Sequence, residues 1–383
     1  MTAPAKVGPL PSVAHLVGTY LAFSETFLYR QMRSWRRYEP WVYAGRAENL
    51  DKFPTDRLEL APEGWPARLW SGAFGEHWTP WFLPRLRARR TAVVHAHYGT
   101  NATNALPFVW FERLPLVVSF YGFDVAYARA PWRHPLYAKY LLLLPLVLRC
   151  ASRLLVVSES LRRELIGLGA PAERVEVHRT GVDTSRFAPA ARAADAAGPA
   201  VVMCGREVEK KGFEYGFDAL ARVKGRGRRF RVLFHGTGNG PLRERLAAQV
   251  VRLGLADVVE SVDPRVPTWE VLRRAELILA PSVTAADGDR EGLPTVLVEA
   301  AASGLPAVAS RHAGIPELVV DGTTGILCDE RDVAGLAGAL ERLLDDAELR
   351  RRMGEAARAR AVEGWDAERL LLRREAIYDE VRA

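Results

Sequence analysis

Apolar residues along this chain gather in short runs that alternate with longer stretches of mixed polarity. In the first half the strand-like runs are Ser12–Gly18, Pro40–Gly45, Ala92–Tyr98, Leu116–Tyr121, Arg153–Ser158 and Arg174–His178. Helix-like stretches lie between them, at Glu25–Trp35, Asn101–Trp110, 135–150 and Glu159–Leu168. Short continuous apolar runs are typical of strands buried on both faces, and longer mixed stretches are typical of helices. The first half therefore predicts an alternating strand–helix domain.

The second half repeats this alternation. Its strand-like runs are Ala200–Arg206, Arg229–His235, Val258–Val262, Leu277–Pro281, Ala307–Ser310 and Gly325–Cys328. Its helix-like stretches are 212–223, Pro241–Leu253, Thr268–Ala275, Thr295–Ser303, 331–344 and 346–363, with a last helix from about Asp366. Residues 187–199 are rich in alanine, contain two prolines and lack apolar periodicity, so we expect a linker there.

Strands that alternate with helices form parallel sheets. The expected fold class is therefore α/β, with two Rossmann-like parallel-sheet domains that face a central cleft. We expect an N-terminal domain at 1–186, the linker at 187–199, a C-terminal domain at 200–365 and a C-terminal helix at 366–383 that packs back on the N-terminal domain. Ligands of such folds bind at the carboxyl ends of the strands, so the cleft is the expected site.

Composition narrows the class of protein. The chain has 383 residues, and 49% of them are apolar, which is ample for buried cores. Since no stretch approaches the roughly 20 apolar residues of a membrane span, and the N-terminus lacks a signal-peptide pattern, we expect neither a transmembrane helix nor export. The three cysteines, Cys150, Cys204 and Cys328, are widely separated. They fit a reducing cytoplasm better than a disulfide framework or a metal cluster.

The net charge of +7 is unevenly placed. Residues 1–186 hold 24 Lys and Arg against 15 Asp and Glu, whereas the remainder holds 29 against 31. Eight of the ten tryptophans also lie in the first half. A basic, tryptophan-rich half suggests a surface that meets an anionic or amphipathic partner such as a membrane. The alternative is that these arginines only cover solvated faces.

The most informative stretch runs from Glu291 to Glu299. It follows the run at Leu277–Pro281 and leads into the helix-like Thr295–Ser303. Helix N-termini attract anions through their free N–H groups. Two carboxylates there would repel a phosphate unless they hold hydroxyl groups while the N–H groups hold the phosphate. This combination suits a sugar nucleotide.

A second polar segment, Gly205–Gly212, follows the first strand of the second half and contains Arg206 and Lys211. These two cations could clamp a diphosphate and stabilise the charge of a diphosphate leaving group. The alternative is a solvated basic loop. The Glu291–Glu299 stretch in the same half favours the clamp.

Three further clusters follow predicted strands. The glycine-rich 236–240, with Gly238, could let backbone approach a nucleotide or could be a plain structural turn. We expect His95 and His97 to point to opposite faces of their strand, so that they share no metal ion and only one, His97, reaches the cleft. Asp124 could contact a sugar hydroxyl or cap a helix.

Taken together, these segments resemble the retaining glycosyltransferases of the GT-B fold grouped as family 4. Glu291 to Glu299 is similar to the Glu-x7-Glu signature of the donor site, and Arg206 with Lys211 to the diphosphate clamp. Smaller matches are Ser24-Glu25-Thr26-Phe27, His95-Ala96-His97, Gly122-Phe123-Asp124, Gly181-Val182-Asp183 and Gly238-Asn239-Gly240-Pro241. The stretch Pro281–Asp289 resembles the colanic-acid and exopolysaccharide branch.

The resemblance implies a role for each matched position. Glu299 would hold the ribose hydroxyls, Glu291 the donor sugar, and backbone of the turn the diphosphate. The implied catalytic residues are Arg206, Lys211 and Glu291; the implied donor-binding residues are Glu299, Gly292, Leu293, Pro294, Thr295, Val296, Gly238 and Ser282; the implied acceptor-side residues are His97, Tyr121, Asp124 and Glu25. Two positions depart from many relatives: Leu293-Pro294 replaces Phe-Gly and removes an N–H donor, and Tyr121 replaces a histidine.

The expected activity is retaining transfer of a sugar from a UDP- or GDP-sugar to a saccharide, lipid-linked at the inner face of the cell membrane. We expect no metal and no cofactor, and no nucleic-acid partner because no motif of the known binding modules appears. A soluble transferase acting on a small acceptor, such as a cyclitol, a phosphate ester or an aglycone, is the alternative enzyme. A non-catalytic nucleotide-sugar-binding protein is the alternative of another class.

Overall fold

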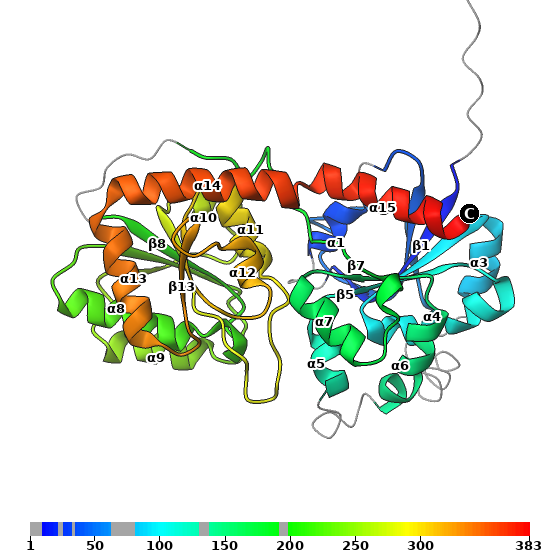
Figure 1. The fold of residues 1–383 in the computed structure, drawn as a ribbon, viewed down its shortest axis with the longest axis horizontal. Helices are drawn as coiled ribbons and strands as arrows, with labels where there is room; N and C mark the ends of the chain where they lie inside the picture. The colour runs from blue at the N-terminus through cyan, green and yellow to red at the C-terminus, as the bar shows by residue number, and fades with distance from the viewer. Residues whose placement is uncertain (1–9, 22–25, 33–34, 63–80, 130–137, 191–197) are drawn as a thin grey trace, which may run out of the picture. The chain divides into compact units, whose positions relative to one another are not determined.

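The computed structural model describes residues 10–21, 26–32, 35–62, 81–129, 138–190 and 198–383 (Figure 1). The chain divides into two units, which are described separately. Unit 1 comprises Met1–Val157, Arg162–His178 and Leu371–Ala383, and unit 2 comprises Ser158–Leu161 and Arg179–Leu370. Within the described part, no helix is long and apolar enough to cross a membrane.

Unit 1 is built on a seven-stranded sheet in the order β3-β2-β1-β4-β5-β6-β7, and every pairing is parallel. The strands are β1 (Ser12–Tyr20), β2 (Glu39–Ala47), β3 (Leu58–Leu60), β4 (Thr91–His97), β5 (Leu116–Phe120), β6 (Arg153–Val156) and β7 (Val175–Val177). The helices are α1 (Thr26–Gln31), α3 (Phe82–Ala88), α4 (Gly99–Glu112), α5 (Phe123–Arg129), α6 (Ala138–Cys150) and α7 (Glu159–Gly167).

Unit 2 has a six-stranded parallel sheet in the order β10-β9-β8-β11-β12-β13. Its strands are β8 (Ala200–Gly205), β9 (Arg231–Gly236), β10 (Val259–Ser261), β11 (Leu277–Ala280), β12 (Ala307–Ser310) and β13 (Gly325–Cys328). Its helices are α8 (Phe213–Gly225), α9 (Arg243–Arg252), α10 (Thr268–Arg273), α11 (Thr295–Ala302), α12 (Ile315–Leu318), α13 (Val333–Asp345) and α14 (Ala347–Trp365). The last helix, α15 (Ala367–Arg382), follows directly.

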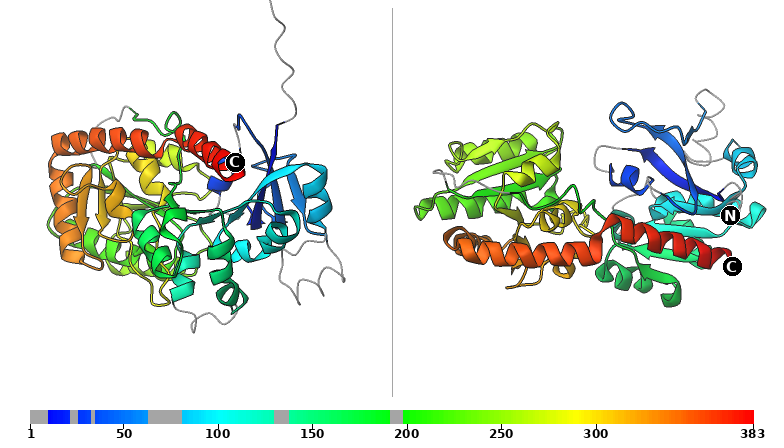
Figure 2. Two further views of the ribbon diagram at one scale, coloured as in Figure 1. Left: turned by 45° about the vertical axis from the view of Figure 1, so that its right-hand side comes forward. Right: turned by 90° about the horizontal axis from the view of Figure 1, so that it is seen from above.

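Helices cover both faces of the unit 2 sheet (Figure 2), and an apolar layer lies between the helices and each face. On one side α11 packs with α14, and Leu297, Val298 and Trp365 lie in that core. On the other side α8 packs with α13 around Phe217 and Leu340. Every residue of β11 and β12 is buried, which explains why these strands are continuous apolar runs rather than alternating ones. The expectation of two parallel-sheet α/β domains is confirmed.

Some elements differ from the sequence-based expectation. The short strand β3 and the helices α3, α5 and α12 were not expected, because three to seven residues carry too little periodicity to stand out. The described residues of the expected linker, 187–190 and 198–199, are grouped with unit 2, whose main segment begins at Arg179. Val182 and Phe187, which are 0% and 1% exposed, both belong to the unit 2 core.

The end of the chain belongs to unit 1. Ile377 and Tyr378 of α15 are fully buried in a core cluster with Val13, Val93 and Val117 of the unit 1 strands. Glu375 is equally buried and accepts hydrogen bonds from the backbone N–H groups of Arg36 and Arg37, both at 2.8 Å. These contacts fix the last turns of α15 against the sheet of unit 1.

Candidate active site

Two loops of unit 2 bring a cation and a carboxylate together. Strands β8 and β11 are hydrogen-bonded neighbours, so the segments that follow them emerge side by side. The first segment carries Lys211 and the second carries Glu291. The Nζ atom of Lys211 lies 2.9 Å from Oε1 of Glu291, and their side chains are 15% and 11% exposed. Residues 80 positions apart in sequence therefore form one half-buried ion pair.

The charges of this pair are set by competing effects. Burial by itself would raise the pKa of Glu291, but the positive charges of Lys211 and then Lys210 outweigh it and lower that pKa to about 2. Glu291 is therefore ionised at neutral pH. An ionised carboxylate accepts hydrogen bonds only, so it could bind sugar hydroxyl groups as a donor-free acceptor.

Gly212 allows the first segment to approach the second strand. Its φ is +60°, and a Cβ atom there would collide with the carbonyl oxygen of Pro281. Only glycine combines this backbone conformation with this contact. The same segment also contacts the loop that precedes Glu291. Lys210 Nζ lies 2.9 Å from Asp289 Oδ2, and Glu209 Oε1 accepts a hydrogen bond from the Ala286 N–H at 3.0 Å.

The two predicted clamp residues differ in exposure. The Lys211 side chain is 15% exposed, whereas Arg206, directly after β8, is exposed. Sequence reasoning missed Lys210, which is 8% exposed and contributes to the pKa of Glu291. Its signal was present in the sequence as the second of two adjacent lysines.

The remaining donor-side residues lie around α11. Pro294 occupies the N-cap position, and none of the side chains in the described part caps this helix. Thr295 and Val296 form its first turn, Gly292 is buried and Leu293 is half-buried. The free N–H groups of a first helical turn can bind an anion. Pro294 contributes none, as expected from its ring.

Glu299 and Ser282 are both buried, at 8% and 1% exposure. Burial, and next the charge of Glu299, raise the pKa of the Cys204 thiol to about 12, while Lys211 lowers it. Glu299, Cys204 at the end of β8 and Lys211 therefore share one neighbourhood.

The glycine-rich turn after β9 has a structural explanation. It wraps around Glu207, which is 2% exposed and accepts hydrogen bonds from the backbone N–H groups of Thr237 and Gly238, both at 3.0 Å. A Cβ atom at Gly236 or Gly240 would collide with Glu207. This favours the structural-turn alternative over the nucleotide one. Sequence reasoning did not single out Glu207, because nothing local marks its partners 30 residues away.

A histidine and a carboxylate outside the predicted set also support the site. The backbone N–H of Glu291 donates to Nε2 of His312 at 3.2 Å, and Nδ1 of His312 lies 2.6 Å from Oε1 of Glu330. His312 follows β12 and is 1% exposed. Neither residue belongs to a motif that the sequence made recognisable.

The expectation for the strand histidines of unit 1 is wrong. Residues two apart on a strand point to the same face, and the rings of His95 and His97 stack with centroids 4.4 Å apart. His15 of the neighbouring β1 joins them, with its Nδ1 3.0 Å from Nε2 of His97. The other nitrogen of His97 lies 2.8 Å from the hydroxyl of Tyr121.

These three histidines are fully buried, and one ligand nitrogen from each lies within 4.8 Å of the others. Burial lowers the pKa of all three, that of His97 to about 3, so the rings are neutral at pH 7. The nearby guanidinium of Arg374 lowers each pKa further.

Asp124 acts as a cap in this structure. Its carboxylate is fully buried and accepts from the backbone N–H groups of Gly99 at 2.8 Å, Val125 at 3.1 Å and Gly122 at 3.2 Å. Burial raises its pKa to about 6, although these hydrogen bonds lower it. The geometry favours helix capping over the sugar-contact alternative. Glu25, the remaining acceptor-side prediction, lies outside the described residues.

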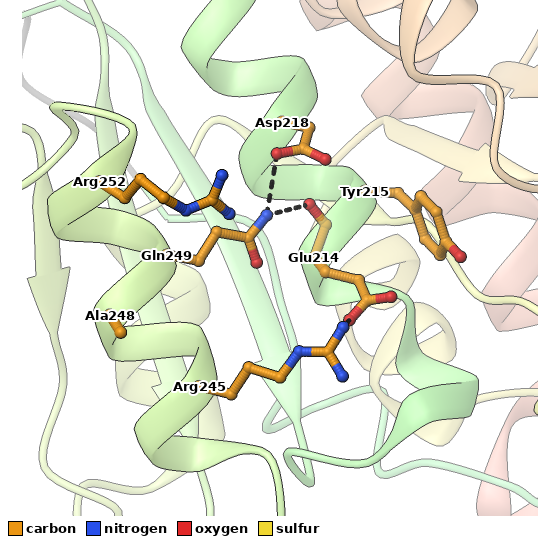
Figure 3. Close-up of a pocket in the computed structure, with 7 residues that line it drawn as sticks. All are labelled: Glu214, Tyr215, Asp218, Arg245, Ala248, Gln249 and Arg252. Carbon is orange, nitrogen blue, oxygen red and sulfur yellow. Dashed lines mark hydrogen bonds and ion pairs between the residues drawn. The ribbon is translucent and has the colours of Figure 1, made fainter.

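A surface pocket between α8 and α9 contains none of the predicted site residues (Figure 3). It is lined by Glu214, Tyr215, Asp218, Arg245, Ala248, Gln249 and Arg252. The amide of Gln249 already donates to the Glu214 carbonyl and to Asp218 Oδ1, both at 2.9 Å. Because these polar groups satisfy one another, the Lys211–Glu291 region is the stronger candidate site.

Comparison with known proteins places the chain. Residues 25–186 match the family model of glycosyltransferase family 4, and residues 186–360 match that of glycosyl transferases group 1. A protein of Escherichia coli K12 named as a colanic acid biosynthesis glycosyltransferase, WcaL, is 35% identical over 258 residues, covering 66% of this chain and 61% of the relative. The amylovoran biosynthesis glycosyltransferase AmsK of Erwinia amylovora is 33% identical over 258 residues, covering 66% and 60%. The chain thus spans about six tenths of these relatives' length.

A solved structure has the same fold. Anabaena Alr3699/HepE, crystallised in complex with UDP and glucose, superposes with a TM-score of 0.77 over 97% of this chain and 100% of that one, at 19% identity. The two parallel sheets, the two domain models and the named relatives agree with the resemblance drawn from the Glu-x7-Glu stretch. This chain belongs to the family 4 and group 1 glycosyltransferases, of the GT-B fold.

Proposed function

We propose that this protein is a retaining glycosyltransferase that moves a sugar from a nucleotide-diphosphate sugar to a saccharide acceptor in exopolysaccharide or cell-surface glycan synthesis. One observation carries the proposal: Lys211 and Glu291, from two loops at the carboxyl edge of one sheet, meet at 2.9 Å beside the start of α11. The relatives named for colanic acid and amylovoran synthesis support the biological setting.

Each group has a chemical role in this proposal. Lys211, with Arg206, stabilises the negative charge that grows on the departing diphosphate. The first N–H groups of α11 bind the same diphosphate. Glu291 accepts hydrogen bonds from donor-sugar hydroxyls, and Glu299 from the ribose. The leaving phosphate assists deprotonation of the acceptor hydroxyl on the same face, without a metal ion or a cofactor.

Donor binding must reorganise the ion pair. Lys211 Nζ is paired with Glu291, so it reaches the diphosphate only by leaving or sharing that contact. The exchange replaces one charge-assisted interaction with another, and its net cost is therefore small. The donor is a UDP- or GDP-sugar; the complexes of HepE with UDP and with UDP-glucose favour UDP.

The acceptor is a lipid-linked saccharide at the inner face of the cell membrane. The excess of basic residues in 1–186 supports contact with an anionic surface. Trp110, Phe111 and Leu142 of unit 1 add large exposed apolar side chains. Flotation with anionic liposomes at low salt should carry the protein upward. Failure to bind would remove the membrane part and favour a soluble transferase with a small acceptor.

A thermal-shift panel of UDP-, GDP- and ADP-sugars tests the donor, because ligand binding stabilises the native state by mass action. We expect one nucleotide series to raise Tm and the wild type to release free nucleotide from that donor. Binding without any turnover across an acceptor screen would favour the non-catalytic alternative. Absence of binding to the whole panel would overturn the proposal.

A further inference from the structure

One carboxylate holds both ends of the loop that leads to Glu291. At the beginning of the loop, Glu330 Oε2 accepts from the backbone N–H of Thr284 at 2.8 Å. At its end, Glu330 Oε1 lies 2.6 Å from His312 Nδ1, and His312 Nε2 accepts from the backbone N–H of Glu291 at 3.2 Å. Glu330 thus fixes one end directly and the other through His312. We call the contacts from Glu330 through His312 to the Glu291 N–H the brace.

This geometry determines the tautomer of His312. A backbone N–H can only donate, so Nε2, which faces the Glu291 N–H, must be the unprotonated nitrogen. The proton therefore sits on Nδ1, where it is donated to Glu330. Hydrogen bonds with His312 and Thr284 lower the pKa of Glu330 against the opposing effect of burial, so the carboxylate is ionised and accepts that proton's hydrogen bond.

A second contact from the same turn fixes the next residue. Gly314 donates its N–H to the carbonyl oxygen of Gly292 at 3.0 Å. A Cβ atom at Gly314 would collide with that carbonyl. The turn after β12 therefore holds two consecutive residues by their backbone groups, the N–H of Glu291 and the carbonyl of Gly292. His312 is 1% exposed, so it lies behind the loop and acts on it from within the protein.

We infer that His312, oriented by Glu330, is a positioning residue that places Glu291 for the sugar moiety of the donor. The inference rests on the proposed function for the identity of that ligand. In this inference, His312 and Glu330 do not contact the nucleotide. Loss of the brace therefore weakens binding of a nucleotide-sugar and leaves binding of the free nucleotide unchanged.

Substitution of His312 by glutamine or by asparagine can test its two hydrogen bonds separately. A glutamine places its amide near the position of Nε2 and can still accept from the Glu291 N–H. An asparagine reaches only the position of Nδ1 and can still donate to Glu330. We therefore expect His312→Gln to preserve the brace and His312→Asn to break it, although both replace the same ring with a smaller polar group. A cooperative thermal transition in each variant would show that both fold.

Hydrogen exchange of the Glu291 amide, followed by mass spectrometry of peptides that cover 285–293, reads the brace without any ligand. A hydrogen bond contributes about 1 kcal/mol, so its loss should speed exchange by about fivefold in His312→Asn. His312→Gln should stay close to the wild type. Equal exchange in the two variants would overturn the assignment of His312 as the anchor of Glu291.

Titration with UDP-glucose and with UDP then tests the role toward the sugar. We expect His312→Asn to lower the affinity for UDP-glucose about fivefold and to leave the affinity for UDP unchanged. Both affinities of His312→Gln should be close to those of the wild type. An equal loss of affinity for UDP would overturn the sugar-specific role. If the wild type bound no nucleotide-sugar of the UDP, GDP or ADP series, the proposed function would fail, and the exchange experiment would still decide whether the brace exists.

Discussion

The two sheets of this protein handle polar clusters in opposite ways. Both place strands in an order that steps outward from their first strand and then reverses, β3-β2-β1-β4 in unit 1 and β10-β9-β8-β11 in unit 2. In unit 1, His15, His95 and His97 lie within the strands and are neutral, because burial lowers their pKa. In unit 2, Lys211 and Glu291 lie on segments beyond the strand ends and are charged.

Position relative to the strand end explains the difference. A side chain inside a sheet is covered by helices on both faces, so an ion there lacks water and the neutral form wins. A side chain beyond the strand end can meet an opposite charge from the neighbouring loop and keeps partial access to solvent. Topology alone therefore does not make a polar cluster a charged site; it depends on whether the residues lie within or after the strands.

The largest expected difference between the two units is in how their stability responds to acid. The folded-state pKa of His97 is about 3 and its ordinary value is 6.5, so its stabilising contribution is complete above pH 6.5 and is lost as the pH falls toward 3. Full protonation would cost about 5 kcal/mol for this group, and His15 and His95 act in the same direction. Asp124, whose pKa burial raises to about 6, acts in the opposite direction but is a single group.

Hydrogen exchange at a series of pH values measures this, with peptides of β1 and β4 compared with peptides around Glu291. Between pH 6.5 and 4.5 protection should fall in β1 and β4, after correction for the intrinsic pH dependence of exchange. The contribution of Glu291, whose pKa is lowered to about 2, is lost only below pH 4.5. Parallel loss in both sets of peptides would contradict the comparison.

Replacement of Lys211 by methionine should convert a charged site into an uncompensated one. Glu291 would stay buried without its first partner, so its pKa should rise and stability should fall by about 3 kcal/mol. Turnover should fall at least tenfold, because the diphosphate also loses its lysine. Urea unfolding and donor turnover are the measurements. Lys224→Met, which breaks a surface pair with Asp257, is the matched control and should cost less than about 1 kcal/mol.

Glu207→Gln tests whether the glycine-rich turn is structural. The amide nitrogen cannot accept from a backbone N–H, so the N–H of Thr237 or of Gly238 loses its acceptor, at a cost of about 2 kcal/mol. Chemical unfolding measures the loss, and Glu209→Gln in the neighbouring segment is the control. If nucleotide affinity fell while stability did not, the turn would be a ligand-binding element instead.

Tyr121→Phe should have the smallest effect. The variant removes the hydroxyl that lies 2.8 Å from His97 Nδ1 and leaves one nitrogen of a neutral ring unpartnered, which costs about 1 kcal/mol. Tyr29→Phe, which removes an exposed hydrogen bond to the Pro54 carbonyl, is the control and should be near neutral in urea unfolding. A loss of acceptor turnover larger than the loss of stability would support the acceptor-side prediction for Tyr121.

The sequence by itself determined the alternation of strands and helices and the segments that carry the candidate site. Runs such as Leu277–Pro281 stand out because a strand covered on both faces must be apolar throughout. Lys211, Glu291 and Glu299 were recognisable because each lies in a segment directly before or within a predicted helix that follows a strand. Such information is local, since it needs only periodicity and the spacing of a few polar residues.

Only the tertiary structure decided which distant groups meet. Glu207 with the turn at 236–240, and Glu330 with His312 and Thr284, join residues 18 to 46 positions apart that share no motif. The same holds for Phe187, the first residue of the expected linker, which is buried in the unit 2 core. Contacts of this kind follow from the three-dimensional packing of loops against neighbouring strands, which one-dimensional periodicity does not encode.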